Sequence, residues 1–138
     1  MGNFAIKDIT RTVLHVPFHQ RCADAMEVYG PGWSIIELVE VETEGGVKGV
    51  GETIQGYTWG HSQEEQFARA HGKNIFDLMW DDALGAGLQM ALFDAAGQHL
   101  GVPCHRLMGL QHREACPVSW WAQSMAPALQ QWLSLQQG

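Results

Sequence analysis

The chain has 138 residues, 46% of them hydrophobic, and a formal net charge of −7 at pH 7. This length fits one domain, or one domain followed by the start of another. The acidic balance, with only three lysines, argues against nucleic acid or an anionic membrane as a partner. No apolar run approaches the ~20 residues of a membrane span, and the N-terminus has no signal-peptide pattern. Three cysteines without a CxxC pair indicate neither disulfides nor a zinc site, so we expect a cytoplasmic protein.

The first elements are predicted to be a strand and a long loop. Residues 6–16 alternate β-branched and polar side chains, which is typical of a half-buried strand, and Pro17 ends it. Residues 17–33 show no clear period and contain the cluster Gly30-Pro31-Gly32, so we expect a loop there. A long loop without structure of its own in a compact domain is usually functional or mobile.

Residues 34–43 and 48–53 are predicted to pair as a hairpin. Glu44-Gly45-Gly46 supplies the turn, because glycine adopts positive φ at little steric cost. Gly49 and Gly51 alternate within the second strand, which indicates a bulge or a second backbone passing close by. With residues 6–16, the two strands predict a three-stranded antiparallel meander.

The middle of the chain predicts a second loop and two short helical segments. Residues 54–61 form an aromatic loop that contains glycine. Ser62 is expected to open a helix with Glu65 as its partner in a capping box, and Gly72 is expected to end it. Asn74 is then expected to cap a short turn over residues 75–79.

Residues 82–109 predict one long buried helix, a sharp stop and a second short helix. Asp81 or Asp82 is expected to cap the long helix, Gly101 to end it and Pro103 to start the next one. Two apolar stripes run along the long helix. They are Leu84, Leu88, Ala91, Leu92 and Ala95, and Ala86, Met90, Phe93, Gly97 and Leu100. We expect burial against the sheet for Leu88, Leu92, Phe93, Ala95 and Leu100.

The last stretch differs from what precedes it. Residues 115–121 predict a strand, and residues 126–137 predict a helix with Pro127 in its first turn. A strand followed by a helix is the opening unit of a βα repeat. The sequence therefore predicts an α+β domain, a three-stranded antiparallel meander packed on a helical bundle, followed by one βα unit.

Two motifs carry a family resemblance. They are residues 41–52, VETEGGVKGVGE, and residues 91–109, ALFDAAGQHLGVPCHRLMG, with Arg113 just beyond. In this order and at this separation they resemble the enolase superfamily, in particular its mandelate racemase and muconate lactonizing branch. The resemblance covers nearly the whole chain. It implies an enolase-like N-terminal capping domain over residues 1–113 and the first βα unit of a truncated (β/α)8 barrel over residues 114–138.

The resemblance also implies a chemistry. In such enzymes a divalent metal, usually Mg²⁺, binds a small carboxylate or acid-sugar substrate while a Lys or His base removes the α-proton. The negative charge of the enediolate must be met by fixed cations. The reaction would be that of an acid-sugar dehydratase, a racemase or a cycloisomerase. The family's Lys-x-Lys base motif is absent here, so we expect no catalytic residue and no metal ligand in this chain, and a missing barrel domain as its partner.

The family's cap contributes two mobile loops that close over the substrate, and by position they map onto residues 17–33 and 54–61. Their large side chains, together with one from the predicted final strand, are the expected substrate-facing residues. These are His19, Tyr29, Trp33, Tyr57, Trp59 and Trp121. Alternatively, Trp33 and Trp59 pack against the edge of the sheet.

Four other residues have a chemical and a structural interpretation, and the structural one is favoured for each. His15 is expected to be a strand residue, and Glu52 to bond backbone or an arginine. Cys104 is expected to be a buried inert thiol. Asp94, a polar break in an apolar helix, is expected to form a salt bridge with Arg106 or Arg113.

Two functions stay open at this stage. The first is the cap of a metal-dependent enzyme, inactive as an isolated chain. The second is a non-catalytic binding or assembly module with the same fold. Residues 115–121 would form an apolar strand without its barrel neighbours, and unpaired strand edges recruit other chains. We therefore also expect a homo-oligomer or an aggregation-prone protein.

Overall fold

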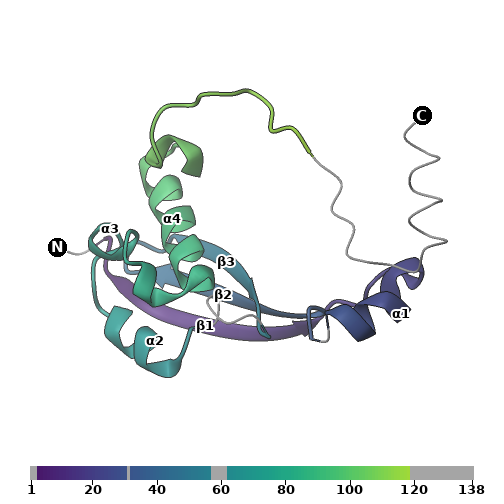
Figure 1. Ribbon diagram of the computed structural model, residues 1–138. Coiled ribbons are helices and arrows are strands. Elements are labelled where there is room, and N and C mark those ends of the chain that lie inside the picture. The colour runs from purple at the N-terminus through teal and green to yellow at the C-terminus, as the bar shows by residue number, and fades with distance from the viewer. Residues whose placement is uncertain (1–2, 31, 57–61, 119–138) are drawn as a thin grey trace.

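The computed structural model describes residues 3–30, 32–56 and 62–118. In chain order they form β1 (Ile6–His15), α1 (Gln20–Tyr29), β2 (Ile35–Thr43), β3 (Lys48–Ile54), α2 (Glu64–Ala70), α3 (Ile75–Leu78), the 3-10 turn η1 (Asp82–Leu84), α4 (Ala86–Leu100) and the 3-10 turn η2 (Cys104–Leu107). The strands pair as an antiparallel meander in the order β1-β2-β3, which confirms the predicted α+β class and sheet. Figure 1 shows α4 at one end of the sheet and α1 at the other.

The hairpin between β2 and β3 turns where the sequence predicted. Gly46 has a φ of +78°, and its N–H donates to the Thr43 carbonyl at 2.8 Å. On β3, Gly49 and Gly51 lie against the backbone of α4. A Cβ on Gly49 would stand 2.1 Å from the Ala91 carbonyl oxygen, so only glycine fits. The predicted close approach of a second backbone is confirmed.

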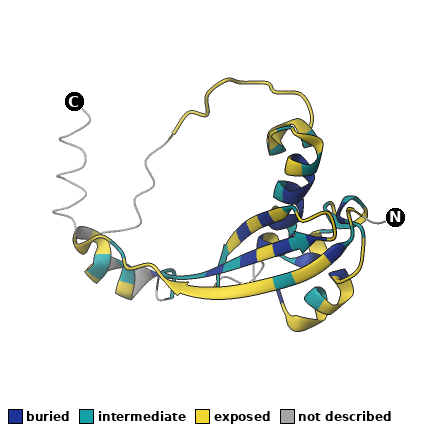
Figure 2. Ribbon diagram, turned by 180° about the vertical axis from the view of Figure 1, so that it is seen from behind, coloured by how far each residue is buried: buried dark blue, intermediate teal, exposed yellow. Residues whose placement is uncertain are grey.

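The core lies between α4 and the inner face of the sheet (Figure 2). Its fully buried side chains include Val39, Val41, Leu84, Leu88, Ala91, Leu92 and Ala95. Burial of each leucine or valine stabilises the fold by about 1.5–3 kcal/mol. Leu88, Leu92, Phe93 and Ala95 are buried as predicted, but the prediction for Leu100 is wrong, because 52% of it is exposed. Met90 on the same stripe is also exposed, whereas Phe93 and Gly97 of that stripe are buried.

The long helix begins later than predicted. The Asp81 carboxylate accepts from the Ala83 N–H at 3.0 Å and so caps η1 rather than α4. At Gly85 the backbone adopts a φ of +86°, which breaks the helical path before α4 starts. The end of the helix was predicted correctly, because Gly101 is left-handed with φ 65° and ψ 30°.

The start of α2 also differs from the prediction. Gln63 is its N-cap, and the Gln66 side chain accepts from the Gln63 N–H at 2.9 Å. Ser62 instead donates its hydroxyl to the Leu84 carbonyl at 2.7 Å inside the core. The expected cap of α3 is confirmed, since the Asn74 side chain accepts from the Phe76 N–H at 3.0 Å.

Residues 17–33 contain a helix, so the prediction of a structureless loop is wrong. The ten residues of α1 include half-buried Ala23 and Met26, and the Gly30 N–H closes the last turn on the Met26 carbonyl at 2.9 Å. α1 lies beyond the end of the strands (Figure 1), and the half-buried side chains described on it are Ala23 and Met26. Two such residues are too few to give the helical period that sequence analysis depends on.

β1 is more exposed than a half-buried strand. Only Ile6 is buried and only Ile9 is half-buried, while the rest of the strand is exposed (Figure 2). The reason is positional: α4 covers β2 and β3, and β1 lies at the edge beyond it. The alternating sequence pattern of β1 therefore identified a strand correctly, but neither face of that strand is fully covered.

Asp94 closes the outer edge of β3 instead of forming the predicted salt bridge. Its carboxylate accepts from the Val50 N–H at 2.9 Å and from the Gln98 amide at 3.0 Å. Gln98 also donates to the Lys48 carbonyl at 2.6 Å. The two side chains of α4 thus occupy backbone groups on the free side of β3, which explains a carboxylate in an apolar helix.

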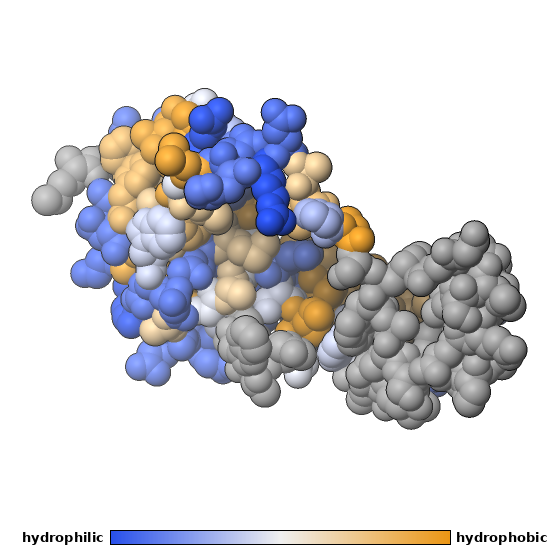
Figure 3. Space-filling model, turned by 45° about the horizontal axis from the view of Figure 1, so that its top comes forward, coloured by the Kyte–Doolittle hydropathy of each residue, from blue (hydrophilic) through white to orange (hydrophobic). Residues whose placement is uncertain are grey.

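Residues 109–118 follow η2 without a helix or strand. The predicted strand is therefore absent over 115–118, while its remaining residues and the predicted helix over 126–137 lie outside the described residues. The domain boundary at residue 113 stays a prediction. Apolar side chains gather on the side that carries α4 and η2, with Leu100, Met108 and Leu110 exposed (Figure 3). Within the described ranges, the helices are too short or too polar to cross a bilayer.

Candidate substrate-facing site

The meander brings the two predicted lid segments to the same end of the sheet. β1 ends, β2 begins and β3 ends there, joined by bonds from the Val16 N–H to the Ser34 carbonyl (2.8 Å) and from the Gln55 N–H to the Ile35 carbonyl (2.9 Å). A Cβ on Gly56 would lie 3.8 Å from the Gly32 carbonyl oxygen, an ordinary contact. The described parts of the two segments therefore lie close together.

Two turns and a proline shape this end. Pro17 cannot donate to the ladder and ends β1. After α1, the Trp33 N–H bonds the Gly30 carbonyl and the Ile35 N–H bonds the Gly32 carbonyl, both at 3.0 Å. Gly32 adopts a φ of +87°, which lets the chain turn back into β2.

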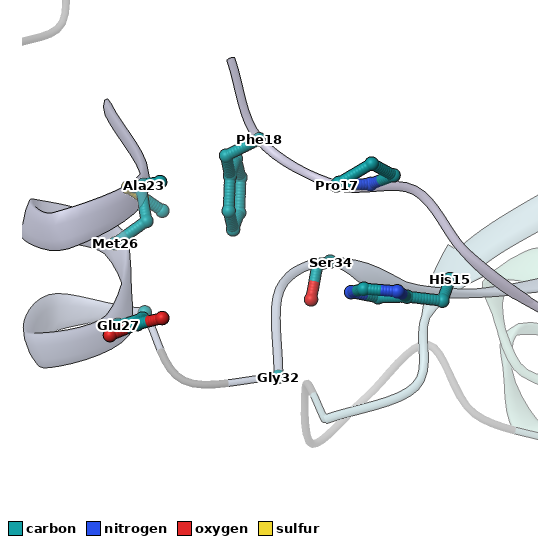
Figure 4. A pocket seen from close by; sticks show the side chains of 9 residues that line it. His15, Pro17, Phe18, Ala23, Met26, Glu27, Gly32 and Ser34 are labelled. Atoms are coloured by element: carbon teal, nitrogen blue, oxygen red, sulfur yellow. The ribbon is translucent and has the colours of Figure 1, made fainter. Parts of the chain in front are cut away.

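Between α1 and the strand ends lies an open hollow of about 360 Å³. It is lined by His15, Pro17, Phe18, Ala23, Met26, Glu27, Gly30, Gly32 and Ser34. Figure 4 shows the Phe18 ring pointing into it, with His15 and Ser34 on one side and Glu27 of α1 on the other. A second hollow, of about 450 Å³, is lined only by the irregular segment from His105 to Cys116.

The first hollow offers a small set of polar groups around an apolar floor. The His15 ring and the Ser34 hydroxyl can donate hydrogen bonds, and the Glu27 carboxylate can accept them. Phe18 and Met26 supply apolar contact. This combination suits a small ligand with a polar end and a short apolar body. His15 and Glu27 are exposed, so the site is open to solvent as it stands.

Of the six predicted site residues, only His19 and Trp33 have side chains within the described part of the chain. His19 is exposed, does not line the hollow, and uses its carbonyl to accept from the Cys22 N–H at 2.8 Å. Trp33 is half-buried with its ring against Gly30 at the end of α1, where a Cβ would stand 3.2 Å from it. Tyr29 is the last residue of α1. Its side chain, together with Tyr57, Trp59 and Trp121, lies outside the described residues.

Sequence reasoning missed Met26, Glu27 and Ser34, and it took His15 only as a strand residue. Ala23 and Met26 lie three residues apart on one helical face, but this single apolar pair is too weak a pattern to have predicted α1 and the wall that it supplies.

The described residues do not fit a magnesium site. Among them, no three His, Cys, Asp or Glu side chains lie close enough to hold a metal. Asp8, Glu40 and Glu42 share the outer face of the sheet, but Lys48 lies among them and Lys7 hydrogen-bonds Glu42. This hydrogen bond and the charge of Lys7 lower the pKa of the Glu42 carboxyl, the behaviour of a paired surface carboxylate.

Cys104 and Glu52 differ from their predicted structural roles. Cys104 is half-buried, not fully buried as expected, and its thiol donates to the Phe93 carbonyl at 3.6 Å. Glu52 is exposed on β3, and no bond to backbone or arginine is formed within the described ranges.

The described residues thus define an α+β domain whose meander opens at one end onto a hollow. The chain is similar to muconate cycloisomerase 1 of Rhodococcus opacus, with 29% identity over 153 aligned positions that cover 93% of this chain. It spans 39% of the length of that relative. No protein-family model matches the chain, and no solved structure matches it. The similarity supports an origin in the enolase superfamily, in agreement with the two sequence motifs.

Proposed function

We propose that residues 1–113 are the capping and substrate-specificity domain of a mandelate racemase or muconate lactonizing type of enzyme. One observation carries the proposal: nearly the whole chain aligns with little more than a third of a cycloisomerase. A segment of that share is the size of a cap, and the described parts of the two predicted lid segments lie at one end of the sheet, where a cap would meet its barrel.

In this role the cap would bind and enclose the substrate while residues outside the described chain perform the chemistry. His15 and Ser34 would hold a polar group of the substrate, and Phe18 and Met26 would exclude water from it. Mg²⁺, held by carboxylates of the barrel, would stabilise the charge that follows loss of the α-proton. The substrate class is a small carboxylate or acid sugar.

The lid assignment belongs to the same proposal. His19, Tyr29, Trp33, Tyr57, Trp59 and Trp121 remain the candidates for contact with substrate as the two segments close. The short distance between Gly32 and Gly56 supports it, because it places the bases of the two segments side by side. In the complete enzyme, Tyr57→Ala or Trp59→Ala should change kcat/KM far more than the melting temperature.

A chimera tests the proposal. In it, this chain replaces the matched segment of the Rhodococcus cycloisomerase, and turnover of muconate and other small carboxylates is measured. We expect a folded protein that turns over at least one of them. His15→Ala and Ser34→Ala should raise its KM at an unchanged melting temperature. Thr10→Ala, exposed on the same sheet but remote from the hollow, is the matched control.

A folded chimera without turnover of any carboxylate would contradict the proposal. That outcome would favour the second function, a non-catalytic assembly module, for which the open outer edge of β1 is the supporting observation. An active chimera in which the hollow variants behave like Thr10→Ala would instead overturn the assignment of the hollow as the substrate-facing site.

A further inference from the structure

The two outer edges of the sheet are treated differently by the rest of the chain. On β3, Asp94 and Gln98 occupy the outward N–H of Val50 and the outward carbonyl of Lys48. On β1, the start of the strand is covered, because the Ile6 N–H donates to the Lys73 carbonyl at 2.8 Å. Farther along, Arg11 reaches toward α2 and bonds Glu64 at 2.6 Å.

Beyond Arg11 the edge of β1 is open. The Val16 N–H bonds inward to Ser34 of the neighbouring chain segment. Because antiparallel strands direct alternate residues to opposite sides, the backbone groups of Val13 and His15 point outward. No other part of the described chain bonds them. The side chains there are apolar and exposed: Val13 by 49%, Leu14 by 39% and Val16 by 52%.

We propose that this open edge pairs with the same edge of a second copy, antiparallel and with Leu14 facing Leu14. Each copy would give its Val13 and His15 backbone groups to the His15 and Val13 of the other. The two meanders would then form one six-stranded sheet about a two-fold axis. This inference does not depend on the proposed enzymatic role.

Charge and size select this register. Facing Leu14 with itself places Thr12 opposite Val16 and Val13 opposite His15, so apolar and β-branched side chains meet without an ion pair. A shift by two residues toward the N-terminus along the partner would face Arg11 with His15, and a shift by four would face Asp8 with Val16. Those pairings oppose two basic groups or bury a carboxylate against a valine.

A second copy also suits the surface better than an unrelated peptide. The pairing is self-complementary, as a two-fold interface requires, because each residue and its partner come from the same strand. On β3 the Val50 N–H and the Lys48 carbonyl are already occupied by Asp94 and Gln98, so this edge is less able to add a further strand than the edge of β1.

The proline variant Val13→Pro tests the pairing in the full 138-residue chain. Proline removes the outward N–H and leaves the inward ladder to β2 intact. We expect sedimentation velocity to show a dimer for the native chain and about tenfold weaker association for the variant, from two lost hydrogen bonds. Val16→Lys, which places charges at the same edge, should weaken association in the same way and serves if the proline variant fails to fold.

A cross-link tests the register. Cys22 and Cys116 are exposed and are first replaced by serine. Leu14→Cys should then form a dimer under mild oxidation, because facing residues of a non-hydrogen-bonded pair bring their Cβ atoms within about 4.5–5.5 Å. Thr10→Cys, exposed on the same face of β1, should stay monomeric in denaturing gels.

Three results would overturn the proposal. They are a native chain that stays monomeric at every concentration, a dimer that both edge variants leave intact, and equal cross-linking of Leu14→Cys and Thr10→Cys. Association through the region after residue 114 would give the second of these results, so the two surfaces are distinguished.

Discussion

Gly51 of β3 lies directly on Gly87 of α4. A Cβ on Gly51 would stand 2.0 Å from the Gly87 carbonyl oxygen and 2.7 Å from the Ala91 nitrogen. Gly49 repeats this relationship one helical turn farther along, against Ala91 and Ala95. The helix can therefore approach the sheet at backbone distance, and Val39 and Val41 of the central strand reach the buried face of α4 from beside it.

Gly51→Ala should destabilise the fold severely. The added methyl would meet backbone atoms of α4, which cannot move aside as a flexible side chain can, so α4 must shift as a whole. We expect a loss of about 3 kcal/mol or more in the free energy of unfolding, measured by urea denaturation. Gly56→Ala, whose methyl would meet nothing closer than 3.8 Å, is the control and should change stability little. Equal effects of the two substitutions would show that the close packing of α4 on β3 is wrong.

The contact between β3 and α4 also shows what sequence can predict. Glycines spaced by two in a strand indicate a close backbone on one side, and that was predicted without knowing which segment provides it. The break at Gly85 was not predicted, because the apolar period runs unbroken from Leu84 into α4 and conceals a change in φ. Burial of Leu100 was predicted from its stripe, but which stripe faces solvent depends on neighbours far away in sequence.

Asp94→Ala should open the second edge of the sheet. The Val50 N–H would lose its acceptor, at a cost of about 1 kcal/mol in stability. Since the outer edge of β1 is already open, the variant would expose unpaired strand groups on both sides. We expect light scattering to detect species larger than a dimer. Asp77→Ala, an exposed carboxylate on α3, should leave both stability and assembly unchanged. A variant that keeps the native size distribution would argue against Asp94 as an edge cap.

The candidate site was only partly predictable for a related reason. The topology of a meander places the ends of β1 and β3 together, so the neighbourhood of the two irregular segments follows from the strand predictions. The wall of the hollow does not, because α1 has little apolar periodicity and depends on packing against the sheet end. Met26 and Glu27 therefore acquire a position only once the helix is known.

Arg11 holds three elements together, and Arg11→Met should cost far more than loss of a surface ion pair. Its guanidinium lies 4.0 Å from the fully buried Glu37 carboxylate, 3.3 Å from the Ser62 carbonyl and 5.4 Å from the Phe67 ring centre. Methionine keeps the apolar contact but removes the charge beside a buried carboxylate. We expect a loss of about 3 kcal/mol in the free energy of unfolding.

The matched control for Arg11 is Arg69→Met. Arg69 pairs with Asp81 at 2.6 Å, but both side chains are substantially exposed, so the loss should stay below about 1 kcal/mol. Adding Glu37→Leu to Arg11→Met should recover part of the stability, because the buried charge is then removed as well. Similar losses for the two arginine variants would refute a special role for the pair of Arg11 and Glu37.

The environment of Glu42 predicts that the stability of the fold decreases slightly as the pH falls into the acid range. The hydrogen bond from Lys7, and then its charge, lower the pKa of the Glu42 carboxyl below its ordinary value of 4.5. A carboxyl with a lowered folded-state pKa adds stability above 4.5, and this contribution disappears as the pH falls through the folded-state pKa. NMR titration of the Glu42 side chain should therefore give a midpoint below 4.5, and added salt should move it back toward 4.5.

Lys7→Gln should likewise raise the titration midpoint of Glu42. Lys73→Gln should leave that midpoint in place, since Lys73 is not among the groups that act on Glu42. If Lys7→Gln leaves the titration midpoint of Glu42 unchanged, the ion pair between Lys7 of β1 and Glu42 of β2 does not persist in solution.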